Sequence, residues 1–402
     1  MVRASSQLPH PGIRYCVGMP HQRSLARGAT RLAFDAVEQL SRIVEGMHAN
    51  IAAASLPLGA GTDGRTRGIT GFVYDSVRVA NAGARTAFDF ALGRLTSNDE
   101  PALPKPQLDV LVAVLNGVIG DHLAATENPL AIQMQLRPEG ESRSRIVLLV
   151  HGLCMNDRQW KRNGHDHGAA LARDLGMTPV YLHYNSGRHV SENGRELAGL
   201  LEALLESWPE PAPELVILAH SMGGLVARSA CHFGAQAGHA WPTRLSQLVF
   251  LGTPHHGAPL ERGGSWVDLL LGLSPYTAPL GRLGMLRSAG ITDLRHGNLR
   301  DEDWQGRDRF ARTGDHRAAL PLPARVRCHA IAGARDVLVP VESALGRHRD
   351  PAKSLAFAES HCWVGEGMNH FDLLDHVEVY ERVRVILTPV APARDRRGRA
   401  GA

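Results

Sequence analysis

A serine between an apolar run and two glycines is the residue of this chain best suited to chemistry. Residues 215–219 read as a buried strand, and Ser221 follows in the segment Ala219-His220-Ser221-Met222-Gly223. A strand, a tight turn and a helix in this order form a nucleophile elbow, which raises a hydroxyl above the carboxyl edge of a sheet. The usual pattern has glycine two residues before the serine, and the small alanine found there leaves room for the same turn. We predict that Ser221 is a nucleophile; the alternative is a serine that only caps the helix.

A second apolar strand, residues 145–150, ends at His151-Gly152-Leu153. In acyl transfer, the negative charge that develops on the substrate oxygen needs two fixed N–H donors. We predict that the backbone N–H groups of Leu153 and Met222 form this oxyanion hole, since glycine at 152 lets the main chain approach a substrate. His151 is expected to shape the turn through hydrogen bonds and to take no proton in the reaction.

A serine nucleophile needs a base, and the base needs an acid that orients it. Asp336 follows a strand-like run at residues 326–333, and His370 follows a glycine-rich loop before the last predicted helix. The chain order serine, aspartate, histidine is that of the α/β-hydrolases, whereas other hydrolase folds use other orders. We therefore predict a catalytic triad of Ser221, Asp336 and His370.

Each of the last two residues has rivals. Glu261, in the loop after the next strand, is the alternative acid. His361 and His376 are the alternative bases. His361 lies in a strand-like segment and His376 is expected about two turns into the last helix, so His370 is the better placed of the three.

The chain resembles α/β-hydrolases of the bacterial lipase and carboxylesterase group, including lipases similar to GPI inositol-deacylase. The matching segments lie across residues 145–388 and are Val150-His151-Gly152-Leu153, Ala219-His220-Ser221-Met222-Gly223-Gly224, Leu251-Gly252-Thr253-Pro254-His255-His256-Gly257, Gly333-Ala334-Arg335-Asp336 and Asn369-His370. The resemblance implies a carboxylic ester hydrolase. In that group the Gly-Thr-Pro-His-His-Gly segment ends a strand and leads into a lid over the acyl pocket.

The order of the predicted elements indicates the fold class. Strands at 179–184, 215–219 and 245–251 alternate with helices at 169–175, 194–208 and 224–234. Such alternation predicts a mostly parallel sheet with right-handed crossovers and helices on both faces. The fold class is therefore α/β, with an α/β-hydrolase fold.

The alternation stops after Gly257 and resumes at residue 326, which leaves an insertion at about 258–323. Its first part holds Trp266 and a run of leucines, and prolines and glycines interrupt it. Apolar helices broken in this way suit a lid that binds acyl chains. We predict that Trp266 and Leu270 bind the substrate, with a preference for medium or long acyl esters. The alternative is an insertion that packs on the core.

The rest of the chain carries no catalytic pattern. We predict disorder in residues 1–28, a helical N-terminal extension at 29–128, a hydrolase domain at 129–388 and a disordered basic tail at 389–402. Helices are expected at 29–56, 72–95 and 108–125, and an edge strand at 129–136. The extension is interpreted as a cap or docking surface on the hydrolase; a membrane-surface or partner-binding helix pair is the alternative.

Composition argues against several classes of binding partner. A net charge of +4 gives little support for nucleic-acid binding, and five cysteines without C-x-x-C spacing favour reduced thiols over disulfides or a zinc site. No signal-peptide core is seen, and the longest apolar stretch, 110–119, is too short to span a bilayer, which predicts a cytoplasmic protein. Transient contact with a membrane surface is compatible with the apolar insertion. The sequence does not indicate an oligomeric state.

The function expected from these residues is hydrolysis of carboxylic esters by a lipase- or carboxylesterase-like serine hydrolase, without metal or organic cofactor. An acyltransferase or thioesterase would use the same triad. A non-catalytic binding protein with a hydrolase fold is a further alternative. The partner is expected to be a small-molecule or lipid ester.

Overall fold

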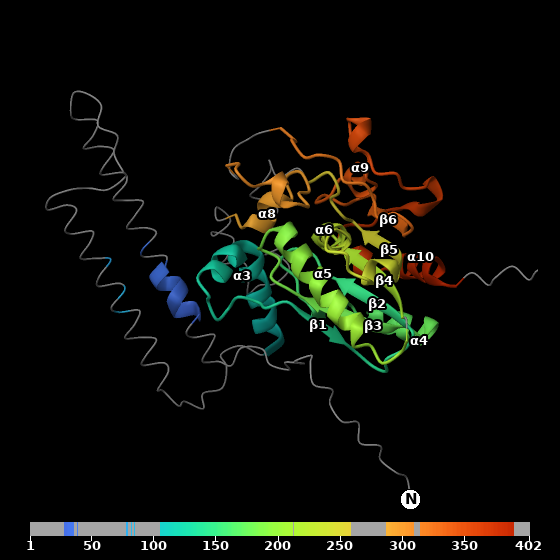
Figure 1. Cartoon of the computed structure of the whole chain (residues 1–402), viewed down its shortest axis with the longest axis horizontal. Helices are drawn as coiled ribbons and strands as arrows, with labels where there is room; N and C mark the ends of the chain where they lie inside the picture. The colour runs from blue at the N-terminus through green and yellow to red at the C-terminus, as the bar shows by residue number, and fades with distance from the viewer. Residues whose placement is uncertain are drawn as a thin grey trace, which may run out of the picture. The chain divides into compact units, whose positions relative to one another are not determined.

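The computed structural model describes residues 28–35, 38, 78, 82, 84, 105–211, 213–258, 287–308 and 314–389 (Figure 1). Contacts divide the chain into two units, one of residues 1–104 and 125–131, the other of residues 105–124 and 132–402. In the first unit, residues 28–35 are helical, and the Asn128 side chain donates a hydrogen bond to the Gly28 carbonyl at 3.1 Å. Most of the helices predicted at 29–56 and 72–95, and the ends at 1–27 and 390–402, lie outside the described residues.

The second unit is built around a sheet that has seven strands within the described residues. Their spatial order is β1-β3-β2-β4-β5-β6-β7, and only the edge strand β1 runs antiparallel to its neighbour. The strands are β1 Gln135–Pro138, β2 Arg145–Val150, β3 Thr178–His183, β4 Glu214–His220, β5 Leu245–Leu251, β6 Arg327–Gly333 and β7 Cys362–Gly365. The predicted edge strand at 129–136 thus exists, but it starts six residues later than expected.

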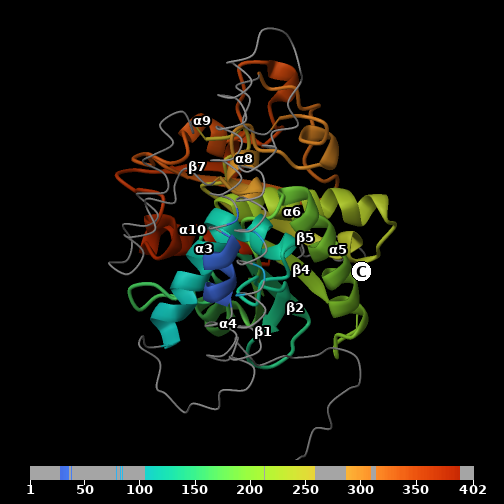
Figure 2. The ribbon, with the colours of Figure 1, turned by 90° about the vertical axis from the view of Figure 1, so that its left-hand side faces the viewer.

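The central strands are continuous apolar runs because both faces of a parallel sheet are covered. Every residue of β2 after Arg145 is buried, and so is every residue of β4 after Glu214. The pair α5 and α6 packs together, as does the pair α4 and α10, and the two pairs lie on opposite sides of the sheet (Figures 1 and 2). The α/β-hydrolase fold, with a mostly parallel sheet and helices on both faces, is therefore confirmed.

The helices begin and end close to the predicted positions. The α-helices are α3 Lys105–Ala125, α4 His167–Leu175, α5 Val190–Glu206, α6 Met222–Gln236, α8 Ala289–Asp293, α9 Val341–Ala344 and α10 Val377–Leu387. Short 3-10 helices occur at Asp157–Trp160, Trp241–Thr243, Asp301–Asp303, Pro351–Lys353, Glu359–His361 and Asp372–Leu374.

Helix α3 belongs by its contacts to the sheet unit, apart from its last residue. Its window Leu108–Ala125 is long and apolar enough to cross a membrane by length and composition alone, and half of it is buried within the protein. The apolar stretch is thus longer than the predicted 110–119. Two glycines let the helix approach the loops at the strand ends: a Cβ at Gly117 would lie 2.8 Å from the Cα of Cys154, and the Gly120 carbonyl accepts a hydrogen bond from Asn185 at 2.8 Å.

Candidate active site

Ser221 sits on a strained turn between β4 and α6. Its φ is +54° and its ψ is −128°, a backbone region that residues other than glycine rarely adopt, at a cost of about 1–3 kcal/mol. Its N–H donates to the Leu251 carbonyl at 2.8 Å, which ties the turn to the end of β5. A Cβ at Gly223 would lie 2.4 Å from the Val150 carbonyl oxygen. Glycine there lets the start of α6 press against β2, so the local sequence produces the predicted elbow.

Asp336 and His370, 34 residues apart, form a buried pair. The distance from Nδ1 of His370 to Oδ2 of Asp336 is 2.6 Å, and the two side chains are 4% and 1% exposed. The other carboxylate oxygen accepts hydrogen bonds from the N–H groups of Leu338 at 2.8 Å and Val339 at 2.9 Å. Because the carboxylate accepts the Nδ1 proton, Nε2 is the nitrogen of His370 that can act as a base.

Two glycines bring the loops of the three predicted residues together. A Cβ at Gly252, whose φ is +59°, would lie 3.1 Å from Nδ1 of His370. A Cβ at Gly152 would lie 2.9 Å from the Cβ of Ser221. The ring of His220, the residue before Ser221, is centred 4.7 Å from the ring of His370. The ends of β2, β4, β5 and the loops after β6 and β7 therefore meet around one point.

The two N–H groups predicted for the oxyanion hole lie in the segments next to Ser221. Within the described part of the chain, neither Leu153 nor Met222 donates its backbone N–H to another group. The following residue, Cys154, has a φ of +60° and donates its N–H to Oγ of Ser186 at 3.0 Å. That bond fixes the bend of the loop that carries the Leu153 N–H.

His151 lies behind this loop. Its Nδ1 is 2.9 Å from the Gly152 carbonyl, and its ring stacks on Tyr184 with centroids 4.3 Å apart. Burial lowers the pKa of His151 to about 3, so the ring is neutral and donates from Nδ1. Both contacts of His151 are of the type expected for a residue that shapes the turn.

The rival histidines have other partners. Nδ1 of His361 is 3.2 Å from the Cys328 carbonyl. His376 is the N-cap of α10, and its Nδ1 accepts from the Glu378 N–H at 3.3 Å. The expectation that His376 lies two turns into the helix is therefore wrong, because residues 372–374 form a 3-10 turn before α10 begins.

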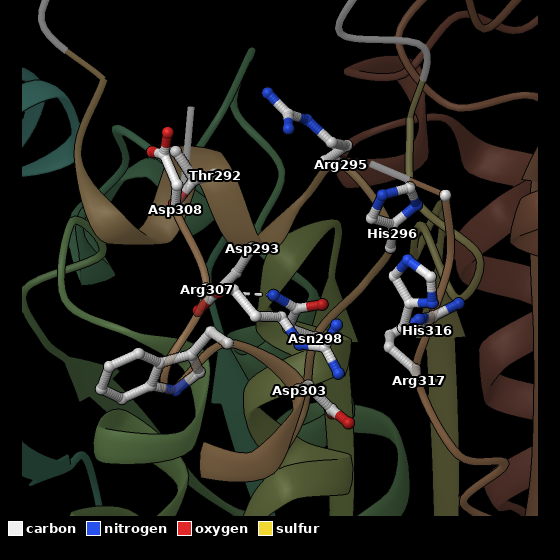
Figure 3. A pocket seen from close by; sticks show the side chains of 12 residues that line it. Thr292, Asp293, Arg295, His296, Asn298, Asp303, Arg307, Asp308, His316 and Arg317 are labelled. Carbon is white, nitrogen blue, oxygen red and sulfur yellow. Dashed lines mark hydrogen bonds between the residues drawn. The ribbon is translucent and has the colours of Figure 1, made fainter. Parts of the chain in front are cut away.

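Part of the prediction lies outside the described residues, namely Glu261, Trp266, Leu270 and the insertion over 259–286. The described part of the insertion, residues 287–308 and 314–323, lines a polar pocket that includes no predicted triad residue (Figure 3). In it, Asn298 donates to Asp293 at 2.9 Å (Figure 3), and the same carboxylate accepts from the Val190 N–H at 2.8 Å. This carboxylate holds the insertion to the start of α5.

The described cysteines are free thiols: Cys154, Cys231, Cys328 and Cys362. Burial raises the pKa of Cys154, Cys231 and Cys328 to about 12, which makes these thiols poor nucleophiles. Among the described residues, no group of three or more histidine, cysteine or acidic side chains could hold a metal ion.

Sequence reasoning missed two contributors to the site. One is α3, whose Gly117 packs on Cys154 in the loop that follows β2. The other is a pair of buried histidines, His167 and His220, that contact the loop of His370. The role of His220 could have been suspected from the sequence, because it lies in the elbow next to Ser221. Nothing in the sequence around Gly117 or His167 marks these two residues as part of the site.

Because α3 packs on the loop that follows β2, replacing a glycine with alanine should have opposite effects in α3 and in α5. Gly117→Ala would place a methyl 2.8 Å from the Cys154 Cα, so we expect a loss of about 1–3 kcal/mol of stability and a lower kcat. Gly199→Ala in α5 meets nothing within 4 Å, so we expect a gain of about 0.5–1 kcal/mol and unchanged kcat. Thermal unfolding and ester kinetics measure both. Equal behaviour of the two variants would show that α3 does not support the loop.

The mostly parallel sheet and the strained strand–turn–helix elbow after β4 together define an α/β-hydrolase fold. A family model described as a domain of unknown function (DUF7379) matches residues 102–294, just under half of the chain. The match begins before α3 and ends before Asp336 and His370. A search of curated proteins found no significant match.

Three solved structures illustrate what the chain is similar to. The mature lipase BlEst2 of Bacillus licheniformis is 15% identical, with 64% of this chain and 98% of that chain covered and a TM-score of 0.41. An esterase of the archaeon Pyrobaculum calidifontis is 16% identical, with 63% and 79% covered and a TM-score of 0.40. YbtT, a type II thioesterase of the yersiniabactin pathway, is 17% identical, with 62% and 94% covered and a TM-score of 0.39.

Proposed function

We propose that this chain is a serine hydrolase that cleaves carboxylic esters through an acyl-enzyme. The observation that carries the proposal is the 2.6 Å contact between His370 Nδ1 and Asp336, set beside a serine on a strained elbow. A serine used only as a helix cap would not explain the strain, because Ser221 makes no side-chain capping bond. Backbone strain of this kind persists where the surrounding structure enforces it, often at functional sites.

In the proposed reaction, Nε2 of His370 takes the proton of Ser221 as the hydroxyl attacks the ester carbonyl. Asp336 stabilises the resulting imidazolium and keeps the ring oriented. The N–H groups of Leu153 and Met222 donate to the oxygen on which negative charge develops. His370 then protonates the leaving alcohol, and a water activated by the same ring releases the acid. No metal or organic cofactor takes part.

The proposed substrate class is that of apolar acyl esters, as for the bacterial lipase and carboxylesterase group that the sequence resembles. Trp266 and Leu270 are the proposed acyl-binding residues of a lid. The proposed setting is the cytoplasm, with transient contact with a lipid surface.

The chain-length prediction is tested with p-nitrophenyl esters from acetate to decanoate. We expect medium or long esters to be preferred, and Leu270→Asp to reduce the decanoate rate more than the acetate rate, since a bound acyl chain would remove water from the new carboxylate without pairing its charge. Val385→Asp is the control, because Val385 is an apolar residue that is 61% exposed on α10. Thermal unfolding shows whether each variant is folded. Equal losses for both esters in a stable Leu270→Asp variant would contradict the lid.

Product analysis with an added alcohol or thiol acceptor completes the test. Free acid as the main product in both conditions supports a hydrolase. Transfer of the acyl group to the acceptor at the expense of hydrolysis would show that the protein is an acyltransferase.

A further inference from the structure

The main chain that carries His370 is contacted by two other buried histidines. Nε2 of His220 lies 3.1 Å from the carbonyl oxygen of His370 itself. Nε2 of His167, the first residue of α4, lies 3.1 Å from the carbonyl oxygen of Leu373. Both rings are fully buried. The loop of the proposed base is thus held at two of its carbonyl groups, three residues apart.

The direction of each hydrogen bond follows from the groups involved. A carbonyl oxygen only accepts, so each Nε2 must carry a proton and donate it. Burial lowers the pKa of His167 to about 3 and that of His220 well below its ordinary value, so both rings are neutral. Nδ1 is then an acceptor in both. For His167 it faces Nε2 of His165 at 3.0 Å, which makes His165 the donor in that contact.

The positions of the two histidines differ in an informative way. His220 precedes Ser221 in the chain, and its side chain is hydrogen-bonded to the main chain of His370. This one hydrogen bond therefore links the proposed nucleophile to the proposed base. His167 acts on the same loop from α4, further from the reacting atoms. The space around His220 is closely filled, since a Cβ at Gly152 would lie 3.2 Å from its Nδ1.

We propose that His220 is a positioning residue that sets the separation of Ser221 and His370 by donating a hydrogen bond to the His370 carbonyl, with His167 as a second support of the same loop. The proposal rests on the proposed function. Proton transfer from the serine depends on this separation, and a misplacement of about 1 Å can cost up to about 100-fold in rate. The ring of His220 needs no contact with substrate, so substrate binding should be little affected.

The test compares variants that keep or lose the donor. A glutamine amide nitrogen reaches about where Nε2 of histidine stands, whereas the shorter asparagine reaches only about as far as Nδ1. We expect His220→Asn and His220→Leu to lower kcat by about 10- to 100-fold with KM nearly unchanged. His220→Gln should keep kcat within about threefold of the unaltered protein. His167→Leu should lose less than His220→Leu. His232→Leu and His232→Gln, half-buried on α6 beside Phe233, are the controls and should change nothing.

A second readout needs no turnover. The Nδ1 proton that His370 shares with Asp336 is observable by NMR, and its exchange with water should speed up in His220→Asn but not in His220→Gln. Equal exchange in the two variants, or equal kcat at equal thermal stability, would overturn the positioning role. An unaltered protein that hydrolyses no ester would instead contradict the proposed function, and the exchange measurement would still decide the role of His220.

Discussion

Replacing Ser221 with alanine is expected to lower ester hydrolysis at least about a thousandfold without unfolding the protein. The Oγ atom of Ser221 would form the bond to the acyl carbon, so the variant lacks the nucleophile. Because triad members act as a unit, His370→Ala should lower the rate by a similar factor. The double variant should be little worse than either single one. Stability should change by less than about 0.5 kcal/mol for Ser221→Ala, because the Ser221 side chain caps no helix and alanine can occupy the same turn at the same strain.

Two measurements check this expectation. Ester kinetics give the loss of rate, and a fluorophosphonate followed by mass spectrometry should label Ser221 alone in the unaltered protein. Ser207→Ala, which removes an exposed hydroxyl at the end of α5, is the matched control and should keep both activity and label. Full labelling of Ser221→Ala at another residue would show that the nucleophile lies elsewhere.

The second large effect is expected for Asp336→Asn. An asparagine can still accept the N–H groups of Leu338 and Val339 through its oxygen, and this leaves its amide nitrogen facing Nδ1 of His370. The ring would then accept at Nδ1 and carry its proton on Nε2, the wrong tautomer for removing the serine proton. We expect a loss of about a thousand- to ten-thousandfold in kcat.

Two carboxylates serve as comparisons for Asp336. Asp350→Asn alters an exposed carboxylate that caps a short 3-10 helix, and it should leave kcat unchanged. Glu261→Gln alters the alternative acid of the sequence analysis. If Asp336→Asn retained near-full rate while Glu261→Gln abolished hydrolysis, the acid would be Glu261, and the His370–Asp336 contact would be structural.

The strained elbow links these expectations to the fold. Ser221 is held at positive φ by the bond of its N–H to β5 and by Gly223, which lets α6 begin against β2. Two further strands of the same sheet, β6 and β7, precede the loops that bring Asp336 and His370 to that edge. The site therefore depends on the ends of several strands at once, which explains why single glycines such as Gly252 are placed against a reacting side chain.

The sequence by itself determined the central sheet and the elbow. Strands β2, β4 and β5 are recognisable because buried parallel strands are uninterrupted apolar runs, and Ser221 is recognisable because strand, turn and helix signals meet within a few residues. Chain order then suggested Asp336 and His370 as partners. The strands and the elbow are recognised from residues close together in the chain. Asp336 and His370 are recognised from the order in which such segments follow one another.

Only the tertiary structure decided which segments far apart in the chain contact one another. It placed Asp336 at 2.6 Å from His370, packed α3 on the loop after β2 through Gly117, and brought His167 and His220 to the carbonyl groups of the His370 loop. It also put a 3-10 turn before α10, where the sequence analysis expected the last helix to have begun. Periodicity reports which face of an element is buried but carries no information on the partner that buries it. Contacts between distant segments, such as that of His167 with Leu373, 206 residues further along the chain, are set only when the loops close around the sheet.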